Sequence, residues 1–189
     1  MKKMVLLSLM VGSINTALAS AVPYVGGSIG INTITSDRVA TGLVGSSILY
    51  DPLFFRGIPF SAFVGFGGAL NQEVYLAGEL TVTIATAEIS DGGLKTSYGY
   101  GVSILPGVML SDYTLAYIRL GLVRTRFSSE NTTTSGMQLG IGMQTNVTQN
   151  VDLRGGYDFT AYRSFDNPFG RVSSPRSDAF NLALVYKFD

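Results

Sequence analysis

The sequence predicts an all-β protein: an eight-stranded antiparallel up-and-down transmembrane β-barrel. First, apolar and polar residues alternate with a period of two along many segments, which a strand can use and a helix cannot. Second, only 14% of the residues are charged, whereas soluble domains usually carry about a quarter. Third, no apolar run of about 18 residues follows the N-terminal segment, so a spanning helix does not account for the mean hydropathy of +0.30.

The N-terminal segment has the features of a secretory leader. Lys2 and Lys3 precede a short apolar stretch, and Ala17-Leu18-Ala19 is a small-x-small cleavage motif. The stretch is too short for a transmembrane helix, which needs about 20 apolar residues. The predicted organisation is a signal peptide over residues 1–21, cleaved after Ala19 or Ala21, and an outer-membrane β-barrel over residues 22–189.

The strands are predicted in order from this alternation. Residues 73–84 are the clearest case: Val74, Leu76 and Leu80 share one face, while Glu73 and Glu79 share the other. The segments 22–33 and 59–70 are glycine-rich, but the strand period fits them better than the helical period. The remaining alternating segments are 97–104, 116–122, 137–144, 151–159 and 180–188. The total is eight strands, an even number, as in bacterial single-chain barrels.

The connections between these strands alternate in length. Tight turns are predicted at residues 69–72, 110–113 and 148–150, and longer polar connections near 34–57, 88–95, 128–134 and 164–176. Short periplasmic turns and long outer loops are typical of outer-membrane barrels, so the predicted location is the bacterial cell outer membrane. With eight strands, both termini fall on the periplasmic side.

The direction in which each face points separates a membrane barrel from a soluble one. The aliphatic faces carry almost no charge, whereas the opposite faces carry small or polar residues that fit a narrow lumen. We therefore expect Leu80, Leu120 and Ile141 to face lipid. Aromatic residues near strand ends are expected to form interfacial girdles, namely Tyr24, Tyr113, Phe127, Tyr162, Tyr186 and Phe188. The alternative is a soluble barrel in which these residues form an ordinary core.

Four segments carry a family resemblance: Pro23 to Gly27, Val74 to Leu80, Val151 to Tyr157, and Leu184 to Phe188. With these motifs the chain resembles the opacity-protein and porin-like small outer-membrane β-barrel superfamily, which includes the N-terminal barrel of outer membrane protein A. The resemblance implies that the last strand is an assembly signal for the barrel-assembly machinery. Its outward residues are Phe180, Leu182, Leu184, Tyr186 and Phe188. Asp189 follows Phe188, which departs from a strictly terminal Phe.

Charged residues of both signs fall on the predicted lumen face. They are Glu73, Glu79, Arg119, Arg154, Asp158 and Lys187. Because unpaired charge is costly in a narrow lumen of low dielectric constant, we expect these groups to pair. The preferred interpretation is an ion-pair plug that holds the strands in register, as the resemblance also implies. The alternative is a gate or selective pore.

The composition argues against several classes of function. The chain has no His and no Cys, so the commonest general base, thiol catalysis and the usual zinc sites are absent. No catalytic residue, metal site or cofactor is predicted. Without Lys2 and Lys3 the chain has 11 basic and 13 acidic residues, a net charge near −2, which argues against nucleic acid as a partner.

Three functions stay open from the sequence. The first is a structural and surface-interaction barrel whose long loops contact a host or another extracellular ligand. The second is a small porin-like channel for ions or solutes, and the third is a soluble periplasmic ligand-binding barrel. The expected partners of the first are outer-membrane lipid, lipopolysaccharide and the barrel-assembly machinery. Residues 51–60 are rich in aromatics, and either join the girdle or barrel mouth, or form an apolar contact site for a host surface or lipid A.

Overall fold

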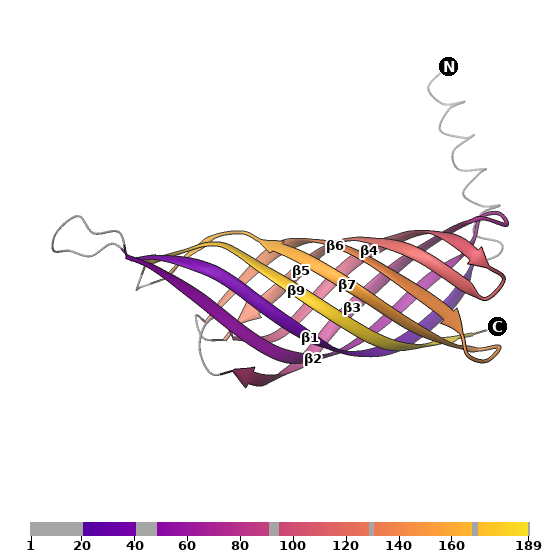
Figure 1. The fold of residues 1–189 in the computed structure, drawn as a ribbon, viewed down its shortest axis with the longest axis horizontal. Helices are drawn as coiled ribbons and strands as arrows, with labels where there is room; N and C mark the ends of the chain where they lie inside the picture. Colours follow the sequence, from indigo (N-terminus) through magenta and orange to yellow (C-terminus); the bar gives the residue numbers. More distant parts are fainter. Residues whose placement is uncertain (1–20, 41–48, 91–94, 129–130, 168–169, 189) are drawn as a thin grey trace, which may run out of the picture.

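The computed structural model describes residues 21–40, 49–90, 95–128, 131–167 and 170–188, which form a closed antiparallel barrel (Figure 1). From β1 to β7 each strand pairs with the next along the chain, β7 pairs with β9, and β9 pairs with β1 to close the sheet. The strands are β1 Val22–Ala40, β2 Leu49–Ala69, β3 Val74–Ser90, β4 Thr96–Ser111, β5 Thr114–Phe127, β6 Thr132–Asn146, β7 Val151–Tyr162, β8 Phe165–Asn167 and β9 Gly170–Lys187.

The three-residue strand β8 pairs only with the beginning of β9, so the wall of the barrel consists of the other eight strands. The predicted eight-stranded antiparallel barrel is therefore confirmed. The short connections 70–73, 112–113 and 147–150 lie at the same end as the beginning of β1 and the end of β9 (Figure 1). Apart from Ala21, the predicted signal peptide lies outside the described residues.

The strands extend further than the sequence pattern predicts. β1 continues to Ala40 and pairs there with Leu49 at the beginning of β2, so much of the region predicted as the loop 34–57 is strand. Parts of the predicted loops 88–95, 128–134 and 164–176 are also strand. The prediction failed there because backbone pairing continues beyond the hydrocarbon layer, where the outward face no longer has to be apolar.

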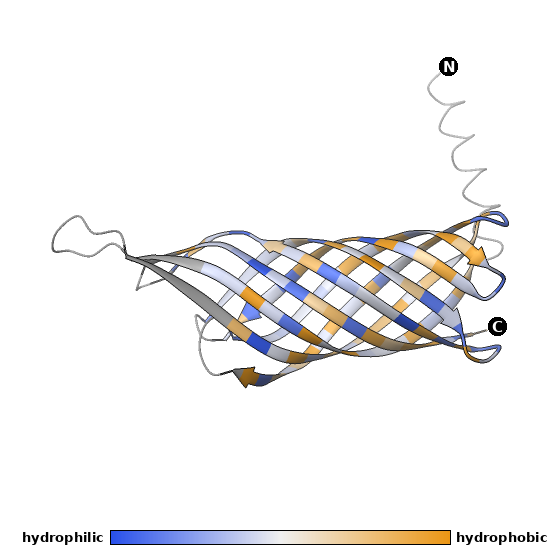
Figure 2. Cartoon of the chain, viewed as in Figure 1, coloured by the Kyte–Doolittle hydropathy of each residue, from blue (hydrophilic) through white to orange (hydrophobic). Residues whose placement is uncertain are grey.

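The faces point as predicted. Leu80, Leu120 and Ile141 expose 58%, 44% and 62% of their surface, whereas Glu79 and Arg119 expose 2% and 8%. Figure 2 shows the resulting alternation of hydrophobic and hydrophilic residues along the strands. No helix within the described ranges is long and apolar enough to cross a membrane.

The outward apolar band has the height of a membrane. On β3 the band runs from Val74 to Ile84, ten residue steps in which the apolar side chains are exposed. At about 3.3 Å per residue and a tilt of about 45°, this run projects to about 23 Å across the membrane, close to the band of about 25 Å typical of such barrels.

The predicted aromatic girdle is only partly correct. Tyr113, Tyr186 and Phe188 are exposed on the outside near the ends of strands. Tyr24 and Phe127 instead have inward parity and are 4% and 0% exposed, and Tyr162 packs beside Phe127. The physical reason is that parity decides the side of the wall on which an aromatic residue lies, and proximity to a strand end does not.

Two apolar layers fill different levels of the lumen. The inner layer, toward the termini, contains Tyr24, Phe63, Ala77, Leu105, Tyr117, Ala183 and Val185, with Tyr75 packed against it. The mouth cluster, at the opposite end, contains Ile34, Phe55, Phe127 and Val172, with Tyr162 and Phe165 packed against it. Glycines make the inner layer possible, because a Cβ atom at Gly65 or Gly142 would overlap the ring of Tyr24 or Tyr117.

Candidate functional site in the barrel lumen

The charged groups of the lumen meet among the side chains of the inner layer and directly above them. Glu79 lies on β3 and Arg154 on β7, which are four strands apart in an eight-stranded wall and therefore face each other across the lumen. Arg154 Nη1 lies 2.5 Å from Glu79 Oε2, and Arg119 Nη1 lies 2.9 Å from Glu79 Oε1. One carboxylate thus joins guanidinium groups from two other strands.

This carboxylate is removed from solvent. The side chain of Glu79 is 0% exposed, and those of Arg154 and Arg119 are 3% and 10% exposed. The hydroxyl groups of Tyr24 and Thr81 also donate hydrogen bonds to Glu79, over 3.2 Å and 3.4 Å. The carboxylate therefore has partners on both oxygens, which a buried charge requires.

Arg154 lies within an aromatic cage. Its guanidinium carbon is 5.4 Å, 5.0 Å and 5.5 Å from the ring centres of Tyr24, Phe63 and Tyr117. Arginine over aromatic faces gains cation–π attraction that increases when water is excluded. The rings therefore fix the arginine laterally while Glu79 fixes its end.

The network continues on both sides of this centre. Arg119 Nε lies 3.6 Å from Asp158 Oδ1, and Asn181 donates a 2.9 Å hydrogen bond to the other oxygen of Asp158. Toward the termini, Gln144 accepts a 2.8 Å hydrogen bond from Arg154 and donates one of 2.6 Å to Asp152. Six wall strands therefore contribute to one polar network: β3, β5, β6, β7 and β9 through these groups, and β1 through Tyr24.

The structure brings together most of the residues that the sequence singled out. Glu79, Arg119, Arg154 and Asp158 form one cluster, whereas Lys187 lies at its inner end and contacts Asp152 at 3.0 Å. The placement of Glu73 in the lumen was wrong, because it lies in the turn before β3 with an exposed side chain, where the strand parity no longer applies.

Asp152 was missed, although a signal for it existed. It has the same strand parity as Arg154 and is 1% exposed, so the alternation that selected Arg154 also selects Asp152. Gln144 carries no charge and could not be found by a search for charged residues. With Asp152, the network holds three carboxylates and three basic groups, so its formal charges cancel.

A polar cavity of about 140 Å³ lies between the network and the mouth cluster. Its lining includes Phe63 and Tyr117 of the inner layer and Tyr162 beside the mouth cluster. Hydroxyl and amide groups line most of the rest, and several bond in pairs, such as Ser61 with Thr83 at 3.0 Å and Ser177 with Asn32 at 2.6 Å. Such a cavity can hold a few water molecules.

The aromatic segment 51–60 divides between the two sides of the wall. Phe55 is fully buried in the mouth cluster, whereas Phe60 faces outward with 43% of its surface exposed. The side chains of residues 51–54 lie outside the described part of the chain. Phe55 thus lies at the barrel mouth. This agrees with the expectation that the segment joins the girdle or the barrel mouth, rather than with an apolar contact site.

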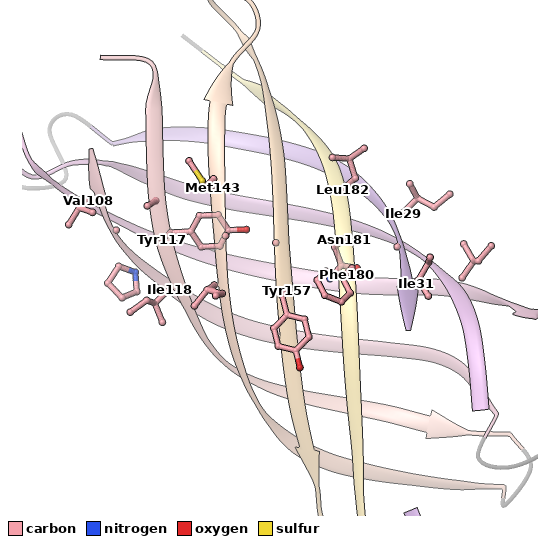
Figure 3. A pocket seen from close by; sticks show the side chains of 18 residues that line it. Ile29, Ile31, Val108, Tyr117, Ile118, Met143, Tyr157, Phe180, Asn181 and Leu182 are labelled. Carbon is pink, nitrogen blue, oxygen red and sulfur yellow. The ribbon is translucent and has the colours of Figure 1, made fainter. Parts of the chain in front are cut away.

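A second hollow belongs to the outer wall. Its labelled side chains in Figure 3 come from β1, β4, β5, β6, β7 and β9, and most are outward apolar residues such as Ile118, Met143 and Leu182. In a bilayer this face meets acyl chains, which occupy hollows of this kind. The lumen is therefore the better candidate for a functional site.

A family model described as "Outer membrane protein beta-barrel domain" matches residues 4–188. The chain belongs to this family. It is an outer-membrane β-barrel of the Gram-negative type and is located in the bacterial outer membrane. No match was found among curated proteins.

Solved structures of small outer-membrane barrels are similar to this outer-membrane β-barrel. The attachment invasion locus protein Ail of Yersinia pestis is 14% identical with a TM-score of 0.45, and the match covers 87% of this chain and 98% of Ail. Neisserial surface protein A is 19% identical with a TM-score of 0.49, and the match covers 89% of this chain and 99% of that protein.

Proposed function

We propose that this outer-membrane β-barrel is a non-catalytic structural and surface-interaction protein whose lumen is closed by its charge network. The contact of Glu79 with Arg154 carries the proposal, because it joins opposite walls and both side chains are almost fully buried. Breaking a buried pair by removing one partner typically costs about 3–5 kcal/mol, because the other charge is then left buried without a partner.

The apolar layers support the same proposal. The rings of the inner layer surround Arg154 at the level of the network, and the mouth cluster lies further toward the outer end. An ion or sugar that crossed the barrel would have to displace both layers as well as the ion pairs. The absence of His and Cys from the sequence supports a non-catalytic role, and no three potential metal ligands gather within the described ranges.

A channel is the second candidate, and the polar cavity favours it. Hydroxyl groups around a space for a few water molecules resemble the lining of a pore that is closed at both ends. A soluble periplasmic barrel is not retained, because the outward faces are apolar and the family is one of outer-membrane proteins.

Conductance in planar bilayers separates the two candidates. We expect the purified, folded barrel to give no steady conductance. The double variant E79S/R154S should give brief openings but no steady conductance if it retains the heat-dependent gel mobility of a folded barrel, since the two side chains that cross the lumen are then short while both apolar layers remain. The exposed-pair variant E88Q is the matched control and should stay silent. Steady conductance of the unaltered protein would overturn the closed lumen and favour the channel.

The surface-interaction part concerns the outer end of the barrel. We propose that the long connections there contact a host or extracellular ligand, because loops held by a rigid barrel carry binding residues more often than the strands do. Bacteria that display the barrel should adhere to cultured host cells more than bacteria that display a variant with residues 41–48 replaced by Gly and Ser. Equal surface amounts and equal adhesion would contradict this.

Two further partners belong to the proposal. Lipopolysaccharide is the expected lipid contact of the outer half of the wall. The barrel-assembly machinery is expected to read β9, whose alternate residues from Phe180 to Tyr186 are all exposed on the outside, as is Phe188 just beyond it.

A further inference from the structure

The outward faces of β5 and β7, which flank β6, change from apolar to basic at the outer end of the barrel. On β5 the exposed Ile118, Leu120 and Leu122 are followed at the next outward positions by Arg124 and Arg126. On β7 the outward Ala161 is followed by the exposed Arg163, directly after the strand ends. The basic residues therefore begin at the level at which the hydrocarbon layer ends.

The sheet register brings these arginines together. Arg124 lies opposite Ser135 on β6, and the backbone N–H of Arg163 donates a 3.0 Å hydrogen bond to the carbonyl of the same Ser135. Because neighbouring strands lie about 4.8 Å apart, the backbones of Arg124 and Arg163 are about 10 Å apart, which two arginine side chains can bridge around one phosphate. Arg126 lies one outward position further, opposite Thr133.

The surroundings of the three arginines favour an anionic ligand at the membrane surface. In the described part of the chain no carboxylate forms an ion pair with Arg124, Arg126 or Arg163, whereas Lys95 at the same end pairs with Glu88. Arg126 is held in place by Asn131, which accepts its hydrogen bond, and by the ring of Tyr98 at 6.0 Å. Exposed tyrosines are typical of the level of lipid head groups.

We propose that Arg124, Arg126 and Arg163 form a binding site for the phosphate groups of lipid A in the outer leaflet. The guanidinium groups would take the phosphates, and the hydroxyl groups of Ser135 and Thr133 lie between them as further donors. The apolar surface directly below, formed by Leu122, Met137 and Ala161, would contact the acyl chains. A ligand with both phosphate and acyl chains fits this surface better than a soluble polyanion.

This inference rests on the proposed contact with lipopolysaccharide and names its site. The folded full-length barrel in detergent micelles is titrated with lipid A and with lipid A from which both phosphates have been removed, and bound lipid is counted by native mass spectrometry. The double variant R124Q/R163Q removes two charges from the site. The matched control R56Q/K95Q removes two charges from the same end of the barrel, one on β2 and one directly before β4.

We expect R124Q/R163Q to bind lipid A about 30-fold more weakly than the unaltered barrel, and R56Q/K95Q to lose less than about threefold. Phosphate-free lipid A should bind all three proteins equally weakly. Equal losses in both variants, or equal affinity for the two lipids, would overturn the site but leave the lipid contact in place. Absence of any lipid A binding, or tighter binding of a heparin fragment that depends on the same arginines, would overturn the lipid partner as well.

Discussion

The inner and outer halves of the lumen have the same wall but are filled by different means. The inner half is crossed by long side chains: Arg154 reaches Glu79 on the opposite wall and lies among three aromatic rings. Between this level and the mouth cluster, the outer half is lined mainly by short hydroxyl and amide side chains, and a cavity of about 140 Å³ is left between them. In a barrel of fixed diameter, the length of the inward side chains decides whether a given level of the lumen is filled by side chains or leaves space for water.

This contrast has an energetic consequence. A buried ion pair in the inner half has no water to replace a lost partner, so each member depends on the others. A hydroxyl in the outer half faces a space that water can enter, so a lost hydrogen bond can be replaced. Substitutions at the two levels should therefore differ in cost, although all of them point into the same lumen.

The largest effect is expected at Glu79. E79Q keeps the shape of the side chain but leaves Arg119 and Arg154 without their shared carboxylate, and should lower the free energy of unfolding by about 3–5 kcal/mol. Urea titration of the folded barrel in lipid vesicles, followed by tyrosine fluorescence and gel mobility, measures this. The control E88Q breaks the exposed pair with Lys95 and should cost no more than about 1 kcal/mol. Equal costs for the two variants would remove the distinction between the inner half and the surface.

A smaller effect is expected in the outer half. T83V removes the 3.0 Å hydrogen bond between Thr83 and Ser61 beside the cavity, and should cost about 0.5–1 kcal/mol in the same titration, because water can bond to the remaining Ser61 hydroxyl. The variant S61A/T83V, which removes both partners, should be no less stable than T83V. A cost near that of E79Q would mean that the outer half is as dry as the inner half.

The sequence predicted the wall better than it predicted the contents of the lumen. Alternation identified the inward face of six of the eight wall strands, and with it Glu79, Arg119 and Arg154, but it assigned no faces to the glycine-rich segments 22–33 and 59–70. It failed where its physical cause is absent: at Glu73, in a turn with no alternating parity, and beyond residue 33 of β1, where no lipid requires an apolar outward face. It also placed Tyr24 and Phe127 in a girdle because position along the strand was given more weight than parity.

Sequence alone determined that this protein is a membrane barrel, because the alternation of apolar and polar residues within a strand indicates which of its faces meets lipid. Only the tertiary structure decided which charges meet. Glu79 and Arg154 are 75 residues apart along the chain, and their contact depends on how many strands close the barrel and on the stagger between them. The grouping of Arg124 with Arg163 likewise depends on the register of β5, β6 and β7. Stagger is a property of paired strands, so the pattern within a single strand does not specify it.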